Sequence, residues 1–72
     1  ILWQKLDEKR RENYETWKSL ARRMGVGVDI LRLWGQGKRR PGAIVFRAIL
    51  YVFPELGGNI LIDLYERDIL RR

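Results

Sequence analysis

Residues 16–41 constrain the fold more than any other part of the 72-residue chain, because they predict two short helices joined by a tight turn. Thr16 is a favourable N-cap, since its hydroxyl can accept a hydrogen bond from a free amide of the first turn. Apolar residues then recur at helical spacing, and Gly25 supplies the left-handed backbone that ends a helix. A second short helix is expected over residues 28–34, with Leu31 on its inner face.

Positive charge is concentrated in the middle of the chain. Residues 16–47 hold eight basic side chains and one acid, Asp29, whereas the rest of the chain holds seven basic and eight acidic side chains. The net charge of +6 therefore comes from the middle segment. Such clustering predicts a face that binds a polyanion, although a solvated basic surface would have the same composition.

Composition argues against several classes of protein. The chain has no cysteine and no histidine, which excludes disulfides, argues against zinc and haem sites, and removes the commonest general acid–base group. We therefore expect no metal, no cofactor and no enzymatic activity. No apolar run approaches the roughly 20 residues of a membrane span, so we expect a cytoplasmic protein with no membrane partner. The chain begins at Ile1 rather than Met, and we expect it to be trimmed or part of a longer protein.

The pattern is helical throughout, and residues 1–72 are expected to form a single all-α domain of five helices. The expected helices cover residues 2–13, 17–24, 28–34, 43–53 and 60–70. The fourth is hydrophobic nearly all round, which predicts a central, buried helix that Pro54 ends. Residues 56–58 form the expected turn before the fifth helix, which Asn59 can cap.

The fifth helix, within about residues 59–71, carries an apolar stripe broader than one buried face needs. We interpret the excess as a homodimer interface formed by Leu61, Tyr65, Ile69 and Leu70. The alternative is that this helix only closes the small core of the domain. Near the other end of the chain, Trp3 is expected at the contact between the first and fifth helices or at an interface.

Two groups of residues follow a known pattern. The first consists of Thr16, Trp17, Leu20, Ala21, Gly25 and Val26. The second consists of Trp34, Gly37, Lys38 and Pro41. In order and spacing these residues resemble the helix-turn-helix family of phage repressors and Cro-type proteins, also called the XRE family. The resemblance covers about half of the chain and implies a five-helix, lambda-repressor-like domain with its helix-turn-helix at about residues 16–35.

The resemblance implies a recognition helix at about residues 28–34, whose N-terminal part enters the major groove of DNA. The implied base contacts come from Gly27, Val28, Asp29 and Arg32. Arg32 can read guanine through its bidentate fork, and Val28 can touch a thymine methyl group. Asp29 can accept a hydrogen bond from cytosine, or it can serve only as a carboxylate that complements the dipole of the first helical turn.

The resemblance also implies two groups of phosphate contacts. One group is Thr16, Trp17 and Lys18, where the free amides at the start of a helix favour an anion. The other group is Lys38, Arg39 and Arg40, which could instead be a solvated loop. Contacts of this kind orient a protein on DNA and carry no sequence information.

Three residues depart from the family pattern. Trp17 replaces the usual glutamine, Gly27 replaces the usual serine or threonine cap, and Leu33 stands where a polar or basic residue is common. The predicted recognition helix is therefore poor in side chains that read bases. Weak specificity, indirect readout of DNA shape and a protein-binding role are all compatible with it.

The leading hypothesis is a DNA-binding transcriptional regulator of the phage-repressor type, acting as a homodimer on double-stranded DNA and associated with the nucleoid. The alternative is a helix-turn-helix repurposed as a protein-interaction module, for example one that binds RNA polymerase or another regulator. A third hypothesis is the DNA-binding part of a longer enzyme such as a recombinase. The salt dependence of affinity for duplex DNA distinguishes the first two, because phosphate contacts weaken steeply with salt.

Overall fold

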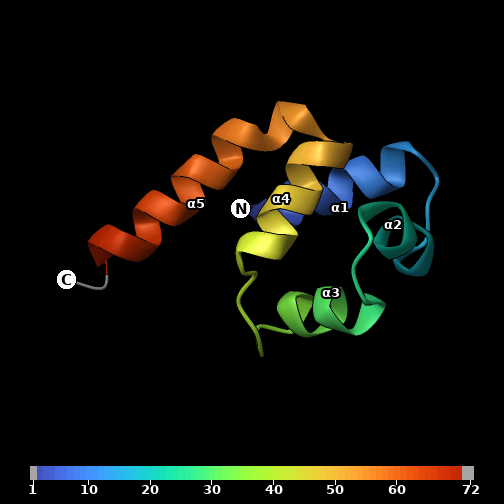
Figure 1. Cartoon of the computed structure of the whole chain (residues 1–72), viewed down its shortest axis with the longest axis horizontal. Helices are drawn as coiled ribbons and strands as arrows, with labels where there is room; N and C mark the ends of the chain where they lie inside the picture. Colours follow the sequence, from blue (N-terminus) through green and yellow to red (C-terminus); the bar gives the residue numbers. More distant parts are fainter. Residues whose placement is uncertain (1, 71–72) are drawn as a thin grey trace.

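In the computed structural model, five α-helices and one short 3₁₀ helix follow one another along the described part of the chain (Figure 1). The structure describes the backbone of residues 2–70 and the side chains of residues 2–66. The elements are α1 (Leu2–Glu12), α2 (Trp17–Met24), α3 (Val28–Gly35), α4 (Ala43–Val52), the 3₁₀ helix η1 (Pro54–Leu56) and α5 (Gly57–Leu70). No strand occurs within the described residues, and the predicted all-α class is confirmed.

The turn between α2 and α3 forms as the sequence predicts. Thr16 caps α2, and its hydroxyl oxygen accepts a hydrogen bond from the Ser19 amide at 3.1 Å. Gly25 ends α2 with a φ of 72°, a left-handed conformation that residues with a β-carbon disfavour. The amide of Val26 then donates to the carbonyl oxygen of Ala21 at 3.1 Å. These local bonds fix the direction in which the chain enters α3.

The core is small and lies where the first four helices meet. Its members are Leu2, Leu6, Leu20, Ala21, Met24, Leu31, Val45, Phe46, Ala48, Ile49, Phe53, Leu56 and Ile60. Leu6, Leu20, Leu31 and Ile49 are fully buried, and each belongs to a different helix. Burying an aliphatic side chain of this size stabilises the folded state by about 1.5–3 kcal/mol, so these positions join the four helices into one unit.

The prediction that α4 is buried all round is wrong. Ile44 and Tyr51, on its outer side, are 77% and 84% exposed. The helix packs against α2 and η1 and contributes Val45, Phe46, Ala48 and Ile49 to the core, which leaves Ile44 and Tyr51 to solvent. The helix also ends at Val52, one residue before its predicted end, because Pro54 disfavours helical geometry at Phe53.

The predicted turn and cap before α5 are also wrong. Pro54–Leu56 form η1, and Gly57 continues from it with helical φ and ψ of −54° and −42°. The helix therefore begins three residues earlier than predicted, and Asn59 lies inside it rather than capping it. The fixed φ of a proline suits the first position of a helical turn. Here the helical conformation then continues through two glycines, although glycine has a low helix propensity.

Only the beginning of α5 joins the core. Ile60 is buried, whereas the apolar residues Leu61, Ile62, Leu64 and Tyr65 that follow it are exposed. In Figure 1, α5 runs away from the other helices toward the C-terminal end of the chain. The alternative that α5 only closes the core therefore explains the apolar residue Ile60, but it does not explain the exposed apolar residues that follow it.

Three tryptophans join α1 to α2 and α3. The rings of Trp3 and Trp17 stack with centroids 4.3 Å apart and planes inclined by 13°. Trp34 meets Trp3 edge-on at a centroid distance of 5.1 Å. Trp3 also lies directly against the backbone of Gly35, where an added β-carbon would be 2.4 Å from its Cζ2. Trp3 thus lies at the junction of α1 with α2 and α3.

Candidate nucleic-acid interface

The outer face of α3 is open to solvent. The side chains of Asp29 and Arg32 are 88% and 58% exposed, and Gly27 at the start of the helix is exposed. Val28 is half-buried against the core, so it offers only part of its side chain. In Figure 1, α3 and α5 lie on opposite sides of α4, which agrees with the exposure of this face. The four residues predicted to touch bases therefore lie together, with Val28 the most enclosed of the side chains.

Arg32 and Asp29 form a loose ion pair on this face. Nη1 of Arg32 lies 3.9 Å from Oδ1 of Asp29, three residues earlier in the helix. A pair this exposed contributes about 0–1 kcal/mol, so the guanidinium can leave it for a stronger acceptor at little cost. Asp29 also complements the dipole of the first turn, where Gly27 supplies no side-chain cap. Arg32 is thus the side chain of α3 best placed to donate to a base edge or a phosphate.

At the start of α2, the first backbone amides are free within the described part of the chain, and two of the three predicted phosphate contacts, Thr16 and Lys18, are exposed to solvent. The Thr16 hydroxyl accepts from the Ser19 amide, and it can still donate its own proton to a phosphate. The ring of Trp17 is half-buried beneath the Arg10 guanidinium, whose Cζ lies 4.8 Å from the ring centroid. Lys18 is exposed. Among the described residues no hydrogen bond engages the amides of residues 17 and 18, so these amides can bind an anion.

The loop after α3 holds three neighbouring cations at residues 38–40, all exposed. Within residues 2–66 none of them forms an ion pair with an acid. Gly37 has a φ of 74°, and the amide of the next residue donates to the carbonyl oxygen of Leu33 at 2.9 Å. Pro41 is buried at the other end of the loop. Both ends of this short loop are therefore anchored, and its charges stay beside α3.

Basic residues nearer the N-terminus are engaged by acids. Arg10 donates to Oδ1 of Asp7 from Nε at 3.1 Å and from Nη2 at 2.9 Å, and Arg11 donates to Oδ2 from Nε at 3.0 Å. The hydrogen bonds from Arg11 and then from Arg10 hold the pKa of the Asp7 carboxyl below its usual value. Glu15 forms a similar pair with Arg23. In the described part of the chain, the basic side chains that form no ion pair with an acid therefore lie on α2 (Lys18 and Arg22), in the loop after α3 and on α4 (Arg47).

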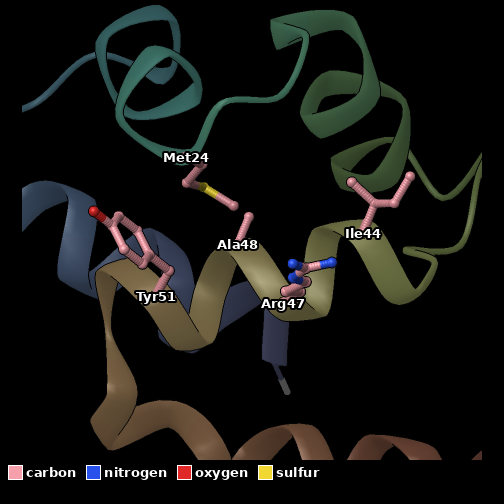
Figure 2. Close-up of a pocket in the computed structure, with 5 residues that line it drawn as sticks. All are labelled: Met24, Ile44, Arg47, Ala48 and Tyr51. Atoms are coloured by element: carbon pink, nitrogen blue, oxygen red, sulfur yellow. The ribbon is translucent and has the colours of Figure 1, made fainter.

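Sequence reasoning missed a hollow on the outer face of α4 (Figure 2). It is lined by Met24 at the end of α2 and by Ile44, Arg47, Ala48 and Tyr51 of α4. The four α4 residues follow the spacing i, i+3, i+4 and i+7, which marks a single helix face. The sequence interpretation assigned this face to the core because the other faces of the helix are apolar as well. We name this feature the α4 hollow.

The predicted dimer interface is described in part. Leu61 and Tyr65 are exposed on α5, as a docking role requires. The predicted contacts from Ile69 and Leu70 lie outside the described side chains. Ile62 and Leu64 are exposed as well, so apolar surface extends over more of α5 than the predicted interface covers.

Within the described residues, no group of three or more acidic, cysteine or histidine side chains is placed to hold a metal ion. No helix in that part of the chain is long and apolar enough to cross a membrane. No protein-family model, no curated protein and no solved structure matches this chain.

Proposed function

We propose that the protein is a DNA-binding transcriptional regulator that places the N-terminal part of α3 in the major groove of double-stranded DNA. The observation that carries the proposal is the exposed face of α3, with Arg32 on it and the unpaired cations of residues 38–40 beside it. A short exposed helix next to a cationic loop meets the two needs of a groove binder, base contact and phosphate neutralisation. The proposed fold is lambda-repressor-like, with α2 and α3 as the helix-turn-helix.

The residues divide these tasks between them. Arg32 exchanges its weak contact with Asp29 for a bidentate contact to guanine, which is worth about 1–3 kcal/mol of discrimination between bases. Lys18, the amides at the start of α2 and residues 38–40 bind phosphates and set the orientation on the duplex. Gly27 adds no side chain, so base recognition by this helix rests mainly on Arg32 and on DNA shape.

We further propose that the regulator acts as a cytoplasmic, nucleoid-associated homodimer assembled through α5. Exposed Leu61 and Tyr65 support this, because large apolar side chains gathered on one helix mark an interaction surface. A two-fold dimer would present two copies of α3 to half-sites about 34 Å apart, which is one turn of DNA.

Selection of bound sequences from a random pool of duplexes, repeated with Arg32→Ala, tests the proposal. The wild-type protein is expected to enrich a preferred site, and the variant is expected to lose the preference at one base position. Lys5→Ala is the control, because Lys5 lies on α1, where it pairs with Glu8. A uniform loss of affinity would instead make Arg32 a phosphate contact. Absence of any duplex binding at low salt would refute the DNA-binding function.

A protein-interaction module is the second candidate function. The observation that favours it is the α3 surface itself, where Gly27 has no side chain and Leu33 is half-buried, so few groups can read bases. Titration of duplex DNA at several salt concentrations separates the candidates. A phosphate binder loses affinity steeply as salt rises, whereas a protein-binding module gives no DNA complex at any salt concentration.

A further inference from the structure

Two exposed apolar surfaces lie close to each other in sequence but on different elements. One is the α4 hollow, where Ile44 and Tyr51 stand out from the helix. The other is the outer side of α5 after Ile60, which we name the α5 ridge; its apolar side chains are Leu61, Ile62, Leu64 and Tyr65. Among the described residues the large exposed apolar side chains gather almost entirely on these two helices. Clusters of this kind mark interaction surfaces.

The two surfaces carry opposite charge. The sequence of α5 contains three acids, Asp63, Glu66 and Asp68, and one basic residue, Arg67, and Glu66 is exposed four residues after Ile62, at the margin of the α5 ridge. The α4 hollow has Arg47 between its two exposed apolar residues (Figure 2). Arg39 lines an adjoining hollow that also includes Ile44. An acidic apolar helix and a basic apolar hollow are complementary in both respects.

The α5 ridge does not reach the α4 hollow of its own chain. Ile60 is held in the core, and beyond it α5 leads away from the other helices (Figure 1). The ten residues from Leu61 to the end of α5 add about 15 Å of helix at 1.5 Å per residue, enough to lie across a neighbouring molecule. A second copy of the chain is therefore the occupant with matching shape and charge.

We propose that the α5 ridge of one copy docks in the α4 hollow of a second copy, and that the second copy returns the same contact. Leu61 and Tyr65 pack against Ile44 and Tyr51 of the other copy, and Glu66 faces its Arg47. In a reciprocal dimer the same contact forms twice, so the buried surface area is doubled. This helps a 72-residue protein to reach the roughly 1,200–2,000 Å² of surface that stable interfaces bury. This inference rests on the homodimer of the proposed function and not on its DNA-binding activity.

Charge reversal tests the pairing, with the mass in solution measured by sedimentation over a range of protein concentrations and without DNA. Arg47→Glu alone and Glu66→Arg alone are each expected to raise the dimer dissociation constant at least about tenfold, because like charges then meet at both contacts. An equimolar mixture of the two variants is expected to restore the wild-type dimer. In the mixed pair, one contact has the reversed charges and the other has the original ones.

Arg22→Glu is the matched control, because it makes the same charge change at an exposed position of α2 outside the hollow. Arg22→Glu is expected to have the same mass in solution as the wild-type protein. The inference is overturned if wild-type protein is monomeric throughout, if Arg47→Glu dimerises normally, or if the mixture stays monomeric. None of these outcomes bears on DNA binding, which the Arg32→Ala selection tests separately, so failure of one proposal is distinguishable from failure of the other.

Discussion

Replacing Gly35 by alanine tests the three-tryptophan junction directly. The new β-carbon would lie 2.4 Å from Cζ2 and 2.8 Å from Cη2 of Trp3, well inside van der Waals contact. The Trp3 ring has little room to retreat, because it stacks on Trp17 and meets Trp34 edge-on. The substitution therefore forces α1 and α3 apart or pushes the ring out of its stack.

The expected size of the effect follows from three terms. Overfilling a packed site costs about 1–3 kcal/mol, and an aromatic pair that is lost costs about 0.5–1.5 kcal/mol. Replacing glycine by alanine in a helix stabilises it by about 0.5–1 kcal/mol. We expect a net loss of about 0.5–4 kcal/mol in the free energy of unfolding, centred near about 2 kcal/mol, which lowers the Tm of a domain of this size by roughly 8–16 °C.

Thermal unfolding followed by far-ultraviolet circular dichroism measures the change. Gly58→Ala is the matched control, because Gly58 lies inside α5 and an added β-carbon meets nothing within 4 Å. It is expected to raise the Tm. In a Trp3→Ala background, Gly35→Ala is expected to stabilise the protein as well, since its obstacle is gone. If Gly35→Ala alone is as stable as the wild type while Gly58→Ala is stabilised, the described position of Trp3 is incorrect.

Four further predictions concern single features. Asp7→Asn is expected to lower the free energy of unfolding by about 0.5–1.5 kcal/mol near neutral pH. Because the pKa of Asp7 is lowered on folding, the difference from the wild type should vanish as the pH falls through that lowered pKa in urea titrations. Tyr14 has a φ of 56°, so Tyr14→Gly should raise the unfolding free energy by about 0.5–1 kcal/mol, and an unchanged urea midpoint would contradict this. Thr16→Val removes the cap of α2 and should cost about 1 kcal/mol by the same measurement, whereas Thr16→Ser should not. Neutralising residues 38–40 with glutamine should reduce the slope of log K against log salt for duplex DNA by about 2–3, and an unaltered slope would remove the loop from the proposed interface.

The sequence alone predicted the structure correctly at positions where a single residue determines the backbone conformation. Thr16 and Gly25 define the ends of α2 through a side-chain cap and a left-handed turn, and both were predictable from residue type alone. The exposure of Asp29 and Arg32 followed from their positions opposite Leu31 on a short helix. Each of these features depends on neighbours within a few residues.

The predictions for α4 and for the start of α5 were wrong. The apolar composition of α4 could not reveal that Ile44 and Tyr51 face solvent, since their exposure depends on how the other helices pack around α4. The contacts of Trp3 with Trp17 and Trp34 were not predicted, because these partners lie on later helices. A proline and two glycines predicted a break before α5, yet the chain continues from η1 into α5 without one.

The clustering of Trp3, Trp17 and Trp34 has a spectroscopic consequence. These are all the tryptophans in the chain, and the close stacking of two of them couples their electronic transitions. Near-ultraviolet dichroism and indole emission should therefore report on a single place, the attachment of α1 to α2 and α3. The native chain thus carries its own optical probe, and detachment of α1 should be visible without any added label.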